Sequence, residues 1–205
     1  MSGERVEFFY DLSSPWTYIA FHNLDALIAR TGVSVRLRPI LVGGVFNAVN
    51  PSVYAAREAA DNPKFKHSWR VMRDWAKLAG VEINFPSIYH PAKSIHAMRM
   101  ACSLADDQVA LKTFSKAAFE SYFGAQDNLD DPDVLVAVAN NAGLDGEAMR
   151  TAAQSDAVKA LLRANTDEVI ARGGYGSPTI FVDTDKMYFG NDQLPLVEAT
   201  FLGKI

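Results

Sequence analysis

The chain has 205 residues and a net charge of −4, and 49% of its residues are hydrophobic while 21% are charged. This composition is ordinary for a globular protein with one sizeable core or two small ones. The mild negative charge argues against nucleic acid or an anionic membrane as a partner, and no run of about 18 apolar residues could span a bilayer. One cysteine, Cys102, and a start without the apolar region of a signal peptide lead us to expect a cytoplasmic protein.

The N-terminal part predicts a strand, a helix and a second strand. The apolar run at 6–10 is typical of a buried strand. Ser14 is a good helix cap, and Pro15 suits the first helical position. Apolar residues then repeat at helical spacing up to Gly32, and residues 33–40 alternate as in a half-buried strand. A strand, a crossover helix and a strand predict a parallel pair.

From about Val45 to Arg172 the pattern predicts helices only. Polar capping residues, some of them followed by proline, mark where these helices begin. The predicted starts are Asn62, Ser94, about Val109, Asp131, Asp145 and Ser155. We expect the helix from Val109 to continue to Phe123 and to stop at Gly124.

Strand character returns near the C-terminus. Residues 179–182 form an apolar run, 183–185 are turn formers, and 186–189 are expected to run back as a hairpin. A last helix is predicted to follow Asn191. The whole chain therefore predicts the order βαβ, several helices, and ββα.

This order is that of an α/β thioredoxin-like fold interrupted by an all-helical insertion, which is too long to be a loop. We expect a discontinuous thioredoxin-like domain of residues 1–44 and 174–205, and a helical domain of residues 45–173.

Redox enzymes of this fold carry Cys-x-x-Cys where the first helix begins, and this chain has Ser14 and Thr17 there. Two cysteines are needed to cycle an internal disulfide, so the sequence excludes a disulfide oxidoreductase. Any thiol at this place must come with a small molecule.

Several motifs together resemble a known family over nearly the whole chain. They are the strand and turn of residues 9–15, the helical insertion, Gly176-Ser177-Pro178-Thr179, and Gly190-Asn191-Asp192. In this order they are similar to the glutathione-dependent 2-hydroxychromene-2-carboxylate isomerases and the kappa-class glutathione transferases, both relatives of DsbA.

The resemblance implies roles for the residues at the start of the first helix and before the last strands. Ser14 matches the family's active-site serine, which lies beside the glutathione sulfur. Ser177 precedes the family's cis-proline, here Pro178, and its backbone pairs with the cysteinyl part of glutathione, in the manner of strand addition.

The resemblance also implies contacts at the two ends of glutathione. Asn50 and Lys64 match residues that contact it, Lys64 at the carboxylate end. Asn191 and Asp192 match the pair that holds the γ-glutamyl end, and Gly-Asn-Asp is more like the isomerases than the Gly-Ser-Asp of the transferases. The family often has arginine next, where this chain has Gln193, which changes the charge near the γ-glutamyl group.

Each of these residues also has a purely structural interpretation. Ser14 and Asp192 are good helix caps, and Lys64 is typical of a solvated surface charge. For Ser14 a functional role is favoured in addition, because a hydroxyl at a helix N-terminus can donate to a thiolate and stabilise its charged form. Ser13 is the competing donor. A nucleophilic serine is disfavoured because His22 lies two helical turns away.

The leading hypothesis is a glutathione-dependent cis–trans isomerase that converts 2-hydroxychromene-2-carboxylate to trans-o-hydroxybenzylidenepyruvate in aromatic degradation. By this resemblance the thiolate adds to the conjugated double bond, the bond rotates, and the thiolate leaves. The alternatives are a kappa-class-like glutathione transferase and a non-catalytic glutathione-binding module. The resemblance implies a small aromatic substrate and a homodimer. No metal is expected from the histidine spacing, and residues 89–91 are a candidate place for a general acid or base.

Overall fold

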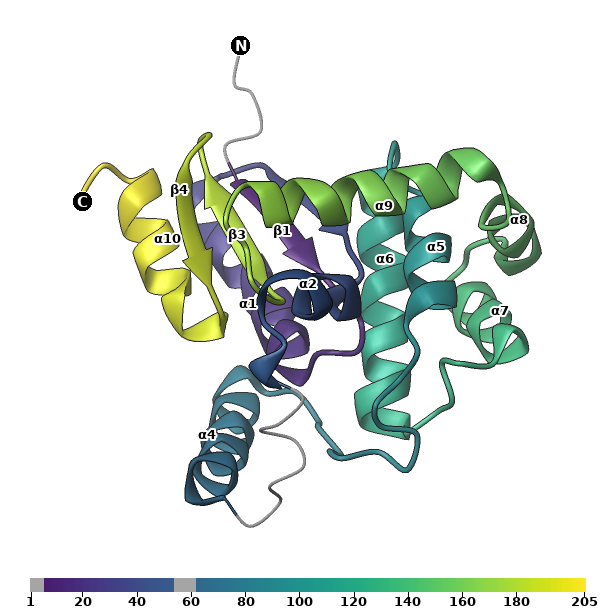
Figure 1. Cartoon of the computed structure of the whole chain (residues 1–205), viewed down its shortest axis with the longest axis horizontal. Coiled ribbons are helices and arrows are strands. Elements are labelled where there is room, and N and C mark those ends of the chain that lie inside the picture. The colour runs from purple at the N-terminus through teal and green to yellow at the C-terminus, as the bar shows by residue number, and fades with distance from the viewer. Residues whose placement is uncertain (1–5, 54–61) are drawn as a thin grey trace.

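The computed structural model describes residues 6–53 and 62–205, and its centre is a four-stranded sheet in the order β2-β1-β3-β4 (Figure 1). The strands are β1 (Val6–Tyr10), β2 (Val35–Pro39), β3 (Thr179–Val182) and β4 (Lys186–Phe189). β1 and β2 are parallel, while β1–β3 and β3–β4 are antiparallel pairs. The predicted crossover unit, the C-terminal hairpin and the thioredoxin-like order are confirmed.

Helices cover both faces of the sheet. They are α1 (Pro15–Thr31) and α10 (Leu194–Phe201) on one face, and α2 (Val42–Val49) and α9 (Asp156–Ala171) on the other. Side chains of a strand alternate between faces. Phe8 and Tyr10 therefore join the core beneath α1, whereas Phe9 packs with Val45 and Val169 beneath α2 and α9.

The remaining helices are one that packs against α1 and a group in the teal and green region of Figure 1, which we call the helical part. They are α4 (Pro63–Ala79), α5 (Ile95–Cys102), α6 (Gln108–Phe119), α7 (Pro132–Asn141) and α8 (Gly146–Ala152). The predicted side-chain caps at Asn62, Asp131, Asp145 and Ser155 each accept a backbone N–H of the first turn.

The structure differs from the predicted helix limits in three places. α6 ends at Phe119, and a π-helix of Glu120–Ala125 continues it. α2 begins at Val42, before the change of pattern that the sequence suggested near residue 45. A 3₁₀ turn of Asn191–Gln193 precedes α10, so Asn191 begins this turn and not the helix itself.

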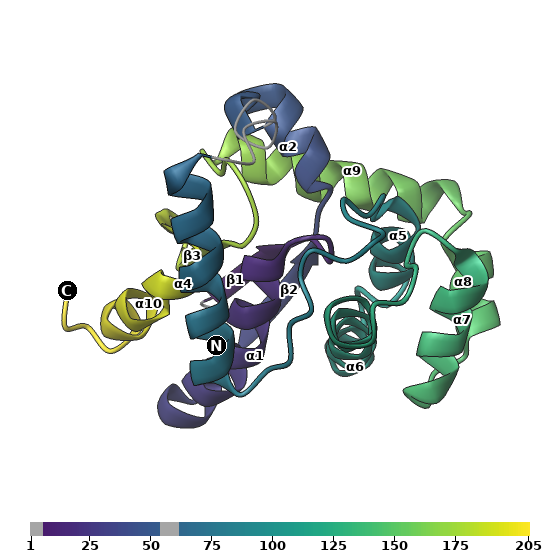
Figure 2. The ribbon, with the colours of Figure 1, turned by 90° about the horizontal axis from the view of Figure 1, so that it is seen from below.

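The helical part and the sheet share one core. Tyr18 of α1 stacks on Phe119 and on Phe123, with ring centroids 5.4 Å apart in each pair. The hydroxyls of Tyr10 and Ser115 are 2.6 Å apart and buried. α6 packs against α1, and Figure 2, seen from below, shows the connection from α4 to α5 crossing the near side of the molecule. The apolar contacts therefore run without interruption from β1 into the helical part.

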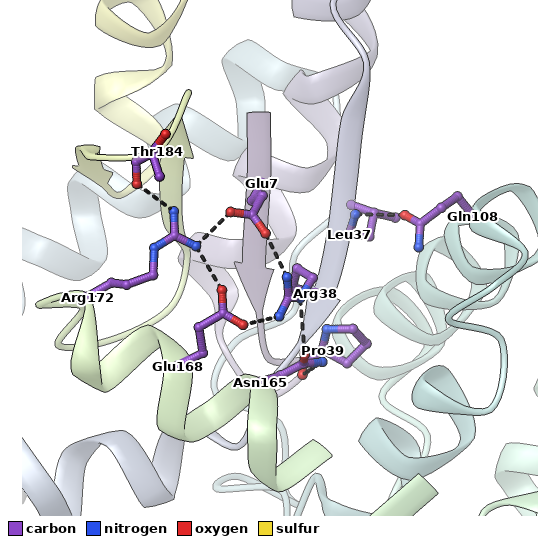
Figure 3. A network of polar contacts seen from close by, with 9 residues as sticks. All are labelled: Glu7, Leu37, Arg38, Pro39, Gln108, Asn165, Glu168, Arg172 and Thr184. Carbon is purple, nitrogen blue, oxygen red and sulfur yellow. Dashed lines mark hydrogen bonds and ion pairs between the residues drawn. The ribbon is translucent and has the colours of Figure 1, made fainter. Parts of the chain in front are cut away.

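A cluster of charged residues fastens α9 to one face of the sheet (Figure 3). Arg38 of β2 and Arg172, which follows α9, both bind Glu7 of β1 and Glu168 of α9. The Arg172 guanidinium also lies 3.7 Å from the centre of the Phe181 ring, where a cation–π contact is favourable. Each charge thus has opposite charges on two different elements.

Candidate functional site

The site is built where α1 begins. Ser14 has extended backbone angles, and its Oγ accepts a hydrogen bond from the Thr17 N–H at 3.2 Å, so it is the N-cap that the sequence predicts. The same hydroxyl donates to the carbonyl oxygen of Ser177 at 3.2 Å. Ser14 is half-buried, and it joins the first turn of α1 to the segment before β3.

That segment contains the Ser177–Pro178 peptide bond, which is cis, as the resemblance implied. The Ser177 hydroxyl lies 2.8 Å from the Thr17 hydroxyl and accepts the Asp11 N–H at 2.9 Å. Thr17 is completely buried. The two residues that replace the cysteines of a redox motif, Ser14 and Thr17, therefore both hold the segment at Ser177 against α1.

Behind the first turn lies a buried carboxylate that the sequence reasoning missed. The carboxylate of Asp11 is fully buried and accepts four hydrogen bonds, from the N–H and the hydroxyl of Ser13, the N–H of Val42 and the hydroxyl of Ser94. Burial raises the pKa of Asp11 above its ordinary value, and the hydrogen bonds from Ser13, Val42 and Ser94 oppose that shift. One residue thus ties together the starts of α1, α2 and α5.

A cavity of about 420 Å³ opens beside Ser177. It is lined by Trp16, Val71, Trp75, Ser177, Phe189, Gly190, Asp192 and Gln193. Gly190 has φ of 97°, and a Cβ at this position would lie 2.9 Å from Asp192 Oδ1, so glycine leaves room for that carboxylate. The wall of one cavity therefore carries both the Asp192 carboxylate, which can pair with a cation, and Ser177, which precedes the cis-proline.

The structure brings together four of the seven residues that the sequence singled out, namely Ser14, Ser177, Pro178 and Asp192. The amide of Asn50 donates to the carbonyl of Tyr175, two residues before Ser177, at 3.2 Å. Asn50 is not among the described residues that line the cavity.

Lys64 and Asn191 are placed differently. Lys64 is exposed in the first turn of α4, and it is not among the described residues that line the cavity. Asn191 is buried, and its Oδ1 accepts a hydrogen bond from Asn23 Nδ2 at 2.8 Å. The Asn191 side chain therefore turns toward α1, and Asp192 alone of this pair lines the cavity.

Cys102 is buried at the end of α5, and burial raises the pKa of its thiol to about 12. A thiol with such a pKa is not ionised near neutral pH, so it is a poor nucleophile. Cys102 therefore does not supply a nucleophile to this site.

Comparison with known families agrees with this geometry. A family model described as the DSBA-like thioredoxin domain matches residues 5–201. The chain belongs to this family. Among the described residues no helix is both long and apolar enough to cross a membrane.

Comparison with individual proteins gives more specific similarities than the family model does. The chain is 28% identical over 199 residues to the 2-hydroxychromene-2-carboxylate isomerase of Sphingobium xenophagum, covering 97% of this chain and 98% of that protein. It is 24% identical to human glutathione S-transferase kappa 1, covering 97% of this chain and 91% of the transferase. A solved structure of a 2-hydroxychromene-2-carboxylate isomerase matches with a TM-score of 0.79 at 25% identity, covering 97% of this chain and 94% of that one.

Sequence reasoning missed Asp11 and the aromatic wall of the cavity, Trp16, Trp75 and Phe189. Asp11 had a visible signal, since it is a charged residue directly after an apolar strand and shortly before the capping serine. Trp75 had none, because helical spacing alone makes it look like an ordinary core residue of α4.

Proposed function

We propose that this protein is a glutathione-dependent cis–trans isomerase that converts 2-hydroxychromene-2-carboxylate to trans-o-hydroxybenzylidenepyruvate. The observation that carries the proposal is the Ser14 hydroxyl at the N-cap of α1, held 3.2 Å from the Ser177 carbonyl beside a peptide-sized cavity, in a chain whose one thiol is buried. The similarity to named isomerases over almost the full chain supports the same reaction.

Each residue of the site has a task in this proposal. Ser14 donates its hydroxyl proton toward the sulfur, and the first turn of α1 adds the positive end of the helix dipole. Ser177 offers its backbone to the extended tripeptide. Asp192 holds the α-ammonium group through a charge-assisted hydrogen bond.

Glutathione supplies the thiolate that adds to the conjugated double bond of the opened substrate and leaves after rotation about that bond. The protein's own contribution is to keep the sulfur ionised and in place. Thr17 and Asp11 contribute indirectly, because their bonds to Ser177 keep the segment before β3 against α1.

A glutathione transferase is the second candidate, and the similarity to the human kappa enzyme favours it. The same Ser14 would ionise the same sulfur, but the conjugate would leave as the product. The two functions differ in whether glutathione is consumed, and a non-catalytic binding module would bind it without turnover.

The test follows the absorbance of 2-hydroxychromene-2-carboxylate with enzyme, with and without glutathione, while free thiol is titrated. We expect isomerisation that requires glutathione and leaves its concentration unchanged. Cys102→Ser should retain most of the activity because its thiol is un-ionised. Asp192→Ala should weaken glutathione binding about tenfold in calorimetry, as expected for the loss of a charged hydrogen bond.

Loss of thiol in step with substrate would favour the transferase instead. Binding of glutathione without turnover of the chromene or of a standard electrophile would leave only the binding module. Unchanged glutathione affinity in Asp192→Ala would remove the proposed site at the γ-glutamyl end.

A further inference from the structure

The side chain of Ser177 lies where three segments of the chain meet. Its Oγ accepts the N–H of Asp11, the residue after β1, at 2.9 Å, and it lies 2.8 Å from the Thr17 hydroxyl in the first turn of α1. Ser177 is only 7% exposed, and it lines the cavity of about 420 Å³. A nearly buried hydroxyl group therefore belongs both to the interior and to the cavity wall.

The burial of Thr17 decides which of the two hydroxyls donates in the bond between them. Thr17 is completely buried, and within residues 6–53 and 62–205 its hydroxyl has one hydrogen-bond partner, the Ser177 hydroxyl. A buried donor without an acceptor is costly, so the Thr17 proton must point at Ser177 Oγ. If Ser177 donated instead, the Thr17 proton would be left in the interior without an acceptor.

Other helical threonines show how such hydroxyls are ordinarily satisfied. The hydroxyls of Thr31 and Thr166 donate to the carbonyl oxygen four residues earlier, at 2.7 and 2.8 Å. Thr17 is bonded across to Ser177, which is on a different segment. Its proton is therefore used to hold the Ser177 side chain.

A count of lone pairs then shows what remains of Ser177. A hydroxyl oxygen has two lone pairs and one proton. Both lone pairs of Ser177 Oγ are taken, one by the Asp11 N–H and one by the Thr17 hydroxyl. Its own proton is left for an acceptor in the cavity. Two donors to an oxygen also polarise its O–H bond, which makes Ser177 a stronger donor.

The hydroxyls of Ser14 and Ser177 border the same place at the start of α1. Ser14 Oγ accepts the Thr17 N–H and donates to the Ser177 carbonyl oxygen, at 3.2 Å in both bonds. The two hydroxyls are thus joined through Thr17 on one side and through the Ser177 backbone on the other. A ligand atom that reaches the Ser14 hydroxyl therefore lies beside Ser177 as well.

We propose that the Ser177 hydroxyl donates a hydrogen bond to the sulfur of the bound thiolate, as a second catalytic donor beside Ser14. This inference rests on the proposed function. The proton stays on Ser177, and the bond stabilises the charged form of the thiol. Thr17 and Asp11 are positioning residues, because they occupy the lone pairs of Ser177 Oγ and leave its proton for the ligand.

The main test compares Ser177→Ala with Ser177→Thr, which keeps the hydroxyl. Thiolate absorbance against pH at saturating glutathione should give a thiol pKa about one unit higher in Ser177→Ala and nearly unchanged in Ser177→Thr, as expected for the loss of a hydrogen bond to a charged group. A pKa in Ser177→Ala equal to that of the unmodified protein overturns the inference.

A ligand without a sulfur separates this role from a structural one. In γ-glutamyl-2-aminobutyryl-glycine a methyl group replaces the thiol of glutathione. By calorimetry at a pH above the pKa of the bound thiol, Ser177→Ala should weaken glutathione about tenfold and this analogue less than twofold. Equal weakening of both ligands would mean that Ser177 acts on the peptide or on the fold, and the inference would be wrong.

Thr17→Val tests the direction of the proton while Ser177 stays in place. With Thr17 as the donor, the variant keeps the Ser177 proton for the sulfur, so the thiol pKa should stay the same or rise by less than half of the Ser177→Ala shift. A lower pKa in Thr17→Val would show that Ser177 had been donating to Thr17, and it would overturn the assignment.

The proposed function can fail separately from this inference. If the unmodified protein binds glutathione as a thiolate but does not isomerise the chromene, the isomerase proposal fails, and the Ser177→Ala shift still decides the role of Ser177. If it binds neither glutathione nor the analogue, both proposals are wrong.

Discussion

At the scale of single residues, the two adjacent serines differ in how firmly their protons are held. The Ser13 hydroxyl donates to the Asp11 carboxylate at 2.8 Å, a short charge-assisted bond. The Ser14 hydroxyl donates to the Ser177 carbonyl at 3.2 Å, a longer bond to a neutral acceptor. Turning the Ser14 proton toward a thiolate therefore costs less than turning that of Ser13, which is why we expect Ser14 to be the donor.

Ser14→Ala should raise the pKa of bound glutathione. A hydrogen bond to a charged group contributes about 1.5–3 kcal/mol, and about 1.36 kcal/mol corresponds to one pKa unit, so the expected rise is about one to two units. Thiolate absorbance in the ultraviolet, followed against pH at saturating glutathione, measures it. Because the thiolate forms only at higher pH in the variant, the isomerase rate should fall near neutrality and recover in part as pH rises.

Ser14→Thr, which keeps the hydroxyl, is the matched control and should leave this pKa near its original value. Ser13→Ala should shift it much less than Ser14→Ala. A larger shift in Ser13→Ala would show that the donor is Ser13. No shift in either variant would mean that neither of these two hydroxyls ionises the sulfur and that Ser14 is only the cap.

At the scale of elements, the position of α9 depends on the charged cluster of Figure 3. The side chains of Glu7, Arg38 and Arg172 are only 18–21% exposed, so their ion pairs are screened less than those at the surface. Since Arg38 and Arg172 share both glutamates, losing one arginine leaves carboxylates with half of their positive neighbours. Removing one charge from such a cluster lowers the free energy of unfolding, because it leaves partly buried opposite charges without their partners. This holds whatever the complete cluster contributes to stability.

Arg172→Met should lower the free energy of unfolding by about 1–3 kcal/mol, less than a fully buried pair because these groups are partly exposed. Urea denaturation measures this change. Arg30→Met is the matched control, because Arg30 also pairs with a glutamate, Glu198, but at the surface, and it should change stability much less. The double variant with Glu7→Gln should lose less than the sum of the single losses, since the partners belong to one cluster. Additive losses would contradict the coupling.

At the scale of the whole molecule, local signals predicted the order of elements well, and contacts between distant segments could not be predicted. The strand at 6–10 and the caps at Ser14, Asn62, Asp131, Asp145 and Ser155 depend on neighbouring residues, and the structure confirms them. The ring of donors around Asp11 joins segments 31 and 83 residues away in the chain, namely Val42 and Ser94. The periodicity of a sequence does not reveal contacts between segments so far apart in the chain.

The contribution of the helical part to the common core was equally hidden. The sequence predicted that its aromatic residues are buried in a core, but it did not predict that this core is shared with the sheet. In the structure Phe119 of α6 contacts Tyr10 of β1 and Tyr18 and Phe21 of α1, so it joins the helical part to the sheet. The buried residues of the helical part and those beneath α1 therefore form one continuous cluster and not two separate cores.

Phe119→Ala should therefore destabilise the whole molecule in a single transition. Truncating a fully buried phenylalanine costs about 3–5 kcal/mol, and Phe119 is completely buried. Tryptophan fluorescence reports on α1 and α4, while far-ultraviolet ellipticity reports on all helices, so urea curves from both should shift together and coincide. Val109→Ala, on the same helix but 78% exposed, should move neither curve appreciably. If the ellipticity of Phe119→Ala fell in a separate, earlier step, the helical part would be unfolding on its own, and the shared core would not be what couples it to the sheet.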